Sequence, residues 1–198
     1  KFQKKEILEL NRIYKCNVKS WKNKYLFKGV KNTKKENIAK KILIAPTWGT
    51  DFYKNKYHEI IFKLLKDTGY EIEIRPHYMS YKKKEIKKND LEKTFRINEN
   101  SINFDEYLTI ITDWSGISIE FTRATYSKSI LINSKQKIMN SEFNLVKNQP
   151  IEIYSRNILG YEIEVDQLDH INDKIKRVAY EKDSDKKKII AFFEKNFY

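Results

Sequence analysis

The sequence predicts an α/β fold, in which a Rossmann-like parallel sheet is flanked by helices. Short apolar runs of strand length recur along the chain, and each ends at a proline or at polar residues. Between them lie longer segments whose apolar residues recur every three or four positions, as on one face of a helix. Strands that alternate with helices make right-handed crossovers, which place the strands in parallel and cover both faces of the sheet.

The first half of the predicted sheet contains two strands and a third candidate. The run ILIAP at 42–46 is a buried strand ended by its proline, residues 70–76 alternate as a strand does, and residues 94–98 are the candidate. A helix joins the first two strands, and Gly69 is placed to end it. The apolar stripe of this helix consists of Tyr57, Ile60, Ile61, Leu64 and Leu65.

The second half of the predicted sheet contains strands at 107–112 and 129–133, joined by a helix over about 115–126. Two helices then complete the domain, the first capped by Asp166 and the second by Ser184. Their buried residues are expected to be Leu168, Ile171, Ile175 and Val178 in the first helix, and Ile189, Ile190, Phe193 and Phe197 in the second.

Residues 1–40 differ in composition from the rest of the chain. They are rich in lysine and asparagine, with scattered aromatic residues and a short helix expected near Lys5–Tyr14. We interpret them as an N-terminal helical or irregular segment or a linker. The Rossmann-like domain is therefore expected over residues 41–198, which is long enough for one sizeable core.

The composition excludes several kinds of protein. The single cysteine, Cys16, excludes an internal disulfide and a metal site built from cysteines. No apolar run approaches the length of a membrane span, and the start KFQKKEILEL lacks the apolar core of a signal peptide. The dinucleotide-binding GxGxxG and the P-loop pattern are both missing. We therefore expect a cytoplasmic protein that needs no cofactor.

The net charge of +13 is carried mainly by lysine. The lysines are spread along the chain, with one dense run, YKKKEIKK, at residues 81–88. A run of this kind is usually a solvated face. Attraction to an anionic membrane surface or to a polyanionic substrate remains open. Nucleic acid ranks behind both as a partner, because no nucleic-acid-binding motif accompanies the charge.

Three polar segments each follow a predicted strand directly. They are APTWGT at 45–50, RPHYMS at 75–80 and TDWSGIS at 112–118. The carboxyl ends of parallel strands meet at one edge of the sheet, and ligands bind in the crevice beyond that edge. We therefore expect the three segments to line one site.

The segment 112–118 is predicted to hold phosphate. The start of a helix leaves backbone N–H groups unpaired and carries a partial positive charge. Ser115 adds a hydroxyl, and Gly116 allows a close approach to the backbone. Asp113 would repel phosphate, so we expect it to brace the turn or to accept a hydrogen bond from a sugar hydroxyl. On this stretch alone, an ordinary helix start capped by Ser115 is the favoured interpretation.

Arg75 and His77 form a candidate cationic pair at the end of the second strand. The pair would grip a diphosphate, and His77 would protonate or hydrogen-bond a leaving phosphate, so both are candidates for catalysis. The alternative is a structural arginine beside a histidine that is satisfied by the backbone. Because His77 lies next to two other segments that follow strands, the functional and the structural interpretations have about equal weight.

Three further residues are weaker candidates. Thr47 would line a phosphate pocket after the first strand, and Trp48 would pack in the core or against a base. Glu120, on the second turn of the helix after Ser115, would accept hydrogen bonds from a ribose, although solvation is its simpler role. No cluster of carboxylates or of cysteine and histidine accompanies them, so we expect no tightly bound metal.

In this order the three segments resemble the CDP-glycerol glycerophosphotransferase family, which includes the teichoic-acid polymerases. The C-terminal half of the family's GT-B fold carries a strand ending in APTW, then R-x-H-Y, then TDYSS before an aromatic-rich helix with an acidic residue. The corresponding strings here are Ala45–Trp48, Arg75–Tyr78 and Thr112–Gly116, with Glu120 and Phe121 after them. The resemblance covers residues 41–135 well and the remainder loosely.

The chain departs from the pattern of the family at three positions. Gly49 stands where the family often has arginine, Gly116 replaces the second serine of TDYSS, and Glu120 replaces an aspartate. These differences leave the transferred group open. A complete GT-B enzyme has two Rossmann-like halves. The resemblance therefore implies that this chain is the donor-binding half, with the acceptor site and the catalytic base in a missing N-terminal half or partner domain.

The resemblance implies a transferase domain that binds a CDP-linked donor, at the inner face of the cell membrane or free in the cytoplasm. A hydroxyl of a surface polymer or lipid-linked acceptor would attack the donor's distal phosphorus and release CMP. In that role the donor would be bound by Ser115, Gly116, Asp113, Thr47 and Glu120, and the transition state would be stabilised by His77 and Arg75. Two alternatives remain open: a GT-B glycosyltransferase that uses a nucleotide-sugar for capsule or lipopolysaccharide synthesis, and a non-catalytic basic module that binds anionic polymer or membrane.

Overall fold

The computed structural model describes residues 8–9, 11–13, 15, 40–138, 143–145, 149–180 and 183–197. Most of segment 1–40 lies outside the described residues, and so does part of the helix expected near Lys5–Tyr14. Leu8, Glu9 and residues 11–13 are helical, as expected for that helix. The interpretation of this segment as a linker stays a prediction.

Within the described residues, six parallel strands form one sheet in the order β3-β2-β1-β4-β5-β6. The strands are β1 Lys41–Ile44, β2 Glu71–Ile74, β3 Arg96–Ile97, β4 Tyr107–Thr112, β5 Ser129–Asn133 and β6 Gly160–Glu164. Every pair of neighbouring strands is parallel. This arrangement confirms the predicted α/β class and the Rossmann-like sheet flanked by helices.

Alternate residues of each strand serve two cores, one on each face of the sheet, because side chains of a pleated strand point in opposite directions in turn. Ile42 and Ile44 of β1 belong to the core beneath α2 (Tyr57–Leu65) and α8 (Ile171–Ala179). Leu43 belongs to the opposite core, which includes Phe121 of α5.

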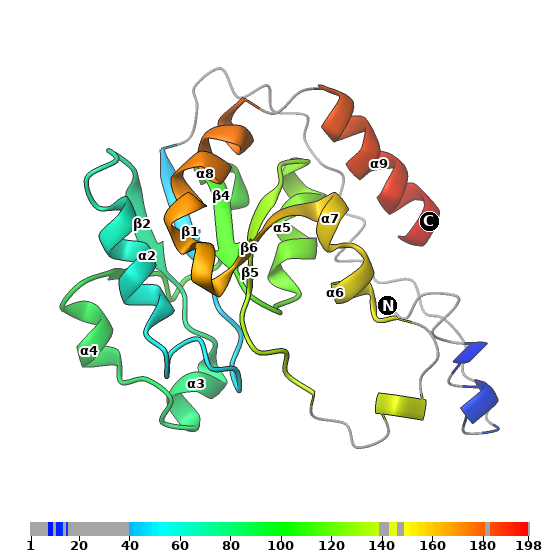
Figure 1. Ribbon diagram of the computed structural model, residues 1–198, viewed down its shortest axis with the longest axis horizontal. Helices are drawn as coiled ribbons and strands as arrows, with labels where there is room; N and C mark the ends of the chain where they lie inside the picture. Colours follow the sequence, from blue (N-terminus) through cyan, green and yellow to red (C-terminus); the bar gives the residue numbers. More distant parts are fainter. Residues whose placement is uncertain are drawn as a thin grey trace.

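The second face of the sheet is covered by α5 (Ile117–Thr125), with α9 (Asp183–Phe197) packed against it. Figure 1 shows α5 and α9 on the side of the molecule away from α2. Ile119 of α5 packs in one cluster with Ile189 and Phe193 of α9. The long C-terminal helix therefore extends the core rather than standing apart from it.

Short helices fill the connections. They are α3 Tyr78–Lys82, α4 Lys88–Glu92, α6 Ile151–Tyr154 and α7 Arg156–Leu159, with 3₁₀ turns η2 Phe104–Glu106, η3 Phe143–Leu145 and η4 Val165–His170. The α3 helix directly follows β2 and lies below the sheet in Figure 1. It therefore stands at the edge where the three polar segments emerge.

Both predicted helix caps are wrong. Asp166 lies within η4, and α8 begins only at Ile171. Ser184 lies inside α9, which already begins at Asp183. A 3₁₀ turn that already includes Asp166 delays the first α-helix, and the second α-helix begins one residue before Ser184.

The buried stripes differ in part from the prediction. Ile60 is 40 % exposed, whereas His58, two residues earlier, is 3 % exposed and packs against Tyr53. Ile189 and Phe193 are buried as expected, and the side chain of Phe197 lies outside the described residues. The strand candidate at 94–98 is reduced to Arg96–Ile97. The sequence pattern did not predict β6.

Candidate functional site

The carboxyl ends of β1 and β4 mark the point where the strand order reverses. From β1 the chain builds outward to β2 and β3, and from β4 it builds in the opposite direction to β5 and β6. In Rossmann folds, which have this strand order, such a switch point opens a ligand-binding crevice. The segments 45–50, 75–80 and 112–118 follow β1, β2 and β4, which are adjacent strands. The structure therefore brings the three segments to one edge.

Asp113 braces this edge from within. It is 1 % exposed, and its carboxylate accepts hydrogen bonds from the backbone N–H of Thr47 at 2.8 Å and the hydroxyl of Thr50 at 2.8 Å. The hydroxyl of Ser134, after β5, lies 3.4 Å from the same carboxylate. Burial raises the pKa of Asp113, and the bonds from Thr47 and Thr50 act against that rise. The geometry favours the bracing role of Asp113 over direct contact with a sugar.

The turn before α5 carries Ser115 and Gly116. The Ser115 hydroxyl accepts a long bond of 3.4 Å from the N–H of Ile117, so it caps the helix only weakly. Within the described residues, no group accepts a hydrogen bond from the backbone N–H of Ser115 or Gly116. A Cβ placed on Gly116 would meet nothing within 4 Å. The turn thus offers an anion two N–H donors and the positive end of α5.

His77 precedes α3 and is held by the backbone. Its Nδ1 accepts a hydrogen bond of 3.1 Å from the N–H of Met79, so the neutral ring carries its proton on Nε2. Loss of hydration, followed by the charge of Lys137, lowers the pKa of His77, while Glu85 acts in the opposite direction. The exposed ring is therefore neutral near pH 7. Its Nε2–H is a hydrogen-bond donor at the edge of the sheet.

Arg75 is committed to the loop after β3. Its guanidinium donates to the side-chain oxygen of Asn98 at 3.1 Å and to the carbonyl of Asn100. Both partners belong to the segment that follows the edge strand β3. The expected partnership of Arg75 with His77 on one phosphate stays a prediction, and the contacts observed give Arg75 a structural task.

A basic and aromatic group surrounds the loop after β1. The ammonium nitrogen of Lys137 lies 3.1 Å from the centroid of the Trp48 ring, and the ring of His77 is centred 6.2 Å from that of Trp48. Gly49 has the positive φ of 76°, which favours glycine, and its N–H donates to Glu85 at 2.8 Å. Trp48 is therefore part of the rim of the candidate site and not of either core.

Arg156 locks the strand ends on the other side of the switch point. It is 5 % exposed and donates to the carbonyl of Asp113 at 2.8 Å and to the side chain of Asn133 at 2.7 Å. Its guanidinium also stacks 4.1 Å from the Trp114 ring centroid and pairs with Glu162 at 3.1 Å. This buried cation fixes the β4, β5 and β6 ends relative to one another.

Thr47 and Glu120 lie at different depths. Thr47 is half-buried, and its backbone N–H is used by Asp113. Glu120 is exposed on the first turn of α5, not the second, because the helix begins at Ile117 rather than at Ser115. Thr47 therefore borders the candidate site directly, whereas Glu120 stands beside it on the outer surface of the helix.

No protein family, curated protein or solved structure matches this chain. In the part of the chain that the structure describes, no helix combines the length and apolar character that a bilayer crossing needs. Among the same residues, no three or more His, Cys, Asp or Glu side chains gather as metal ligands would.

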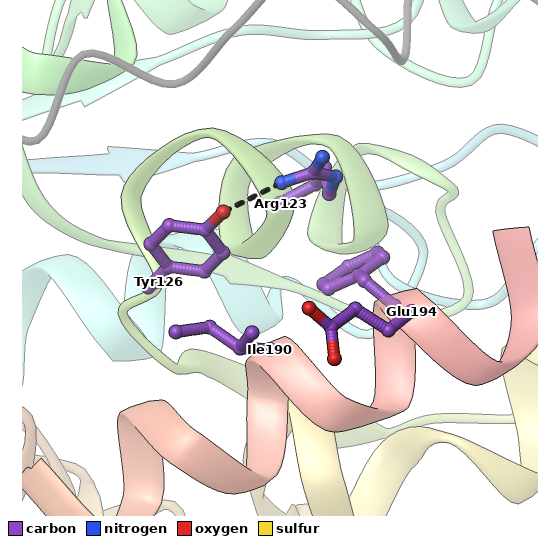
Figure 2. A pocket seen from close by; sticks show the side chains of 5 residues that line it. Arg123, Tyr126, Ile190 and Glu194 are labelled. Carbon is purple, nitrogen blue, oxygen red and sulfur yellow. Dashed lines mark hydrogen bonds between the residues drawn. The ribbon is translucent and has the colours of Figure 1, made fainter. Parts of the chain in front are cut away.

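A cavity of about 280 Å³ lies away from this edge, between α5 and α9. Figure 2 shows Arg123 and Tyr126 facing Ile190 and Glu194 across it, and the Arg123 guanidinium donates to the Tyr126 hydroxyl at 2.8 Å. Arg123 and Tyr126 belong to the end of α5, which returns toward the start of β5. This cavity is therefore at the amino edge of the sheet, opposite the three segments.

Sequence reasoning missed Lys137, Glu85 and Arg156. Lys137 lies in a connection with no motif, and Arg156 lies in a short helix that the pattern did not predict. Glu85 belongs to the run at 81–88, which the sequence indicated only as a solvated face. The polar residues after the strand at 129–133 are a signal that was not used: that strand also ends at the carboxyl edge of the sheet. Their contacts join positions far apart in sequence, which no local spacing encodes.

Proposed function

We propose that this chain binds a CDP-linked donor at the carboxyl edge of β2, β1 and β4 and serves the transfer of a polyol phosphate to a hydroxyl acceptor. The strand order is the observation that carries the proposal. It brings the three segments that resemble the glycerophosphotransferase family to neighbouring strand ends at the switch point. The groups that a CDP-linked substrate would meet there are backbone N–H groups and a neutral histidine. Both can donate hydrogen bonds to an anionic diphosphate.

The roles follow from which groups are accessible. The hydroxyl of Ser115 and the N–H groups of Ser115 and Gly116 bind oxygens of the diphosphate. The Nε2–H of His77 donates to an oxygen that gains charge in the transition state. Asp113 holds the loop of Thr47 against this turn and does not touch the donor. Trp48 offers the rim an aromatic face for the base or the polyol.

The proposed reaction is a phosphoryl transfer. The acceptor's hydroxyl oxygen forms a bond to the distal phosphorus, and the bond from that phosphorus to the bridging oxygen breaks. CMP leaves with the electron pair, and the acceptor's proton passes to a base outside the residues named here. Positioning and charge stabilisation supply most of the acceleration in reactions of this kind.

Calorimetric titration of the chain with CDP-glycerol, CMP, UDP and a UDP-sugar tests the proposal. We expect the cytidine nucleotides to bind, and His77→Ala and Ser115→Ala each to weaken the binding of CDP-glycerol by roughly tenfold. Lys66→Ala is the matched control, because Lys66 follows α2 at the amino edge of the sheet. It removes one exposed lysine and should leave the affinity unchanged.

Two other outcomes would replace the proposal. A clear preference for UDP and the UDP-sugar would make the chain a nucleotide-sugar glycosyltransferase domain. Failure of every nucleotide to bind, with an anionic polymer still bound by wild type and by both alanine variants, would make it a basic binding module. In the second case the affinity should fall steeply with salt, since lysine charges alone would carry it.

A further inference from the structure

Lys137 is a second cation beside His77, and the loop after β5 brings it there. Its ammonium group lies over the Trp48 ring at 3.1 Å, and its charge is close enough to lower the pKa of His77. Trp48, His77 and Lys137 come from the connections after β1, β2 and β5. The cluster therefore exists only in the folded chain.

The loop that carries Lys137 is fixed to the candidate site at three points. The Ser134 hydroxyl approaches the Asp113 carboxylate at 3.4 Å, and the Ser134 carbonyl accepts from the Trp114 indole N–H at 2.9 Å. The backbone N–H of Lys135 donates to Asp51 at 3.1 Å. Lys137 follows these anchors by two residues, so its main chain has a defined place at the rim.

Among the described residues, the charge of Lys137 lacks a close anionic partner. In the segments that the structure describes, no carboxylate forms an ion pair with it, and the nearest charges that raise its pKa are Glu85 and Asp113. Burial has the larger effect and lowers the pKa of Lys137. A partly desolvated ammonium group that faces an aromatic ring gains strongly from an incoming anion.

We infer that Lys137 supplies the cation that binds the donor's diphosphate, the task that the sequence pattern assigns to Arg75. Arg75 already donates hydrogen bonds to Asn98 and Asn100. Lys137 instead lies over Trp48, which follows β1 at the switch point. A hydrogen bond between ammonium and phosphate is stronger than the contact with the ring. Lys137 therefore leaves the Trp48 ring when diphosphate binds. The inference rests on the proposed donor site and names its main electrostatic contact.

NMR titration with inorganic pyrophosphate tests this role without a nucleotide. The indole N–H signal of Trp48, assigned by its loss in Trp48→Phe, reports the departure of Lys137 from the ring. We expect this signal and that of His77 to shift saturably in the wild-type chain. Lys137→Gln should weaken binding by about tenfold or more and abolish the Trp48 shift.

Two matched variants serve as controls. Lys135→Gln removes an exposed lysine of the same loop. Arg75→Gln removes the cation that the sequence pattern assigns to the diphosphate. Both should bind pyrophosphate nearly as the wild type does, provided that their amide spectra show an intact fold. Wild-type affinity in Lys137→Gln, or no pyrophosphate binding to the wild-type chain, would overturn the inference.

The outcomes separate this inference from the proposed function. Pyrophosphate that binds through Lys137, in a chain with no preference for cytidine nucleotides, would retain the inference and reject the CDP-linked donor. Cytidine nucleotides that bind equally to wild type and Lys137→Gln would retain the donor and reject Lys137.

Discussion

At the scale of single residues, Tyr107 and Tyr53 are buried tyrosines with opposite surroundings. The Tyr107 hydroxyl donates to Glu73 at 2.5 Å and accepts from Asn98 at 2.8 Å. Among the described residues, no group bonds the buried hydroxyl of Tyr53. Hydrogen bonding therefore stabilises one hydroxyl, and burial without a partner penalises the other.

We expect Tyr107→Phe to lower the free energy of unfolding by about 1–3 kcal/mol, because it leaves the Glu73 carboxylate without its closest donor. Tyr53→Phe is its matched control. It should change the free energy of unfolding by less than about 1 kcal/mol, in the stabilising direction if at all. Urea unfolding of both variants measures the difference, and equal destabilisation would refute the assigned contacts.

The free energy of unfolding depends on pH through Glu73. Burial opposes its ionisation, but bonds from Tyr107 and Asn98 and the charges of Lys41 and Arg96 outweigh burial and lower its pKa. A lowered pKa in the folded state stabilises the fold above the ordinary pKa of glutamate. That contribution is lost as the pH falls toward the folded value.

We therefore expect the free energy of unfolding to fall below about pH 5, and to fall less steeply in Glu73→Gln. The two proteins should differ most near pH 7 and converge in acid. Urea unfolding across this range measures both slopes, with Glu152→Gln as the control, since Glu152 is exposed on α6. Parallel pH profiles for wild type and Glu73→Gln would contradict the assigned pKa direction.

At the scale of elements, two glycines at the starts of β6 and α5 have different reasons to be glycine. A Cβ on Gly160 would lie 2.5 Å from the Leu131 side chain and 2.8 Å from the Ser129 carbonyl oxygen, both in β5. A Cβ on Gly116 would meet nothing within 4 Å, and its φ of −61° is open to any residue. Close strand packing therefore requires only the first glycine.

Gly160→Ala should destabilise the protein by about 1–3 kcal/mol, because β6 must move away from β5. Gly116→Ala should stabilise it by about 0.4–1 kcal/mol, because the unfolded chain loses freedom while the folded turn is unstrained. Thermal and urea unfolding of both variants check the two signs. Destabilisation by Gly116→Ala would mean that the turn before α5 is tighter than the structure shows.

The sequence pattern predicted the strands whose residues are buried on both faces. β4 and β5 are apolar runs in the sheet interior, and their predicted bounds match the structure. β6 is an edge strand in which exposed and buried residues mix, and it begins with glycine, so no run marked it. The caps at Asp166 and Ser184 failed because packing, not the capping side chain, decided where those helices begin.

At the scale of the whole molecule, topology explains why the site was only partly predictable. Parallel strands have one carboxyl edge, so the convergence of the segments holding Thr47, His77 and Ser115 followed from the fold class alone. The fold class did not predict which side chains at this edge face outward. Burial of Asp113 and the position of Lys137 over Trp48 depend on contacts between loops that lie far apart in sequence.

The most direct test of the account is an NMR titration of the chain with CDP-glycerol, followed through assigned backbone amides. We expect the shifts to concentrate at Trp48–Gly49, His77, Ser115–Gly116 and Lys137, which surround the ends of β1, β2, β4 and β5. Shifts confined to the cavity between α5 and α9, or spread over the exposed lysines of α2 and α9, would contradict a donor site at the carboxyl edge of the sheet.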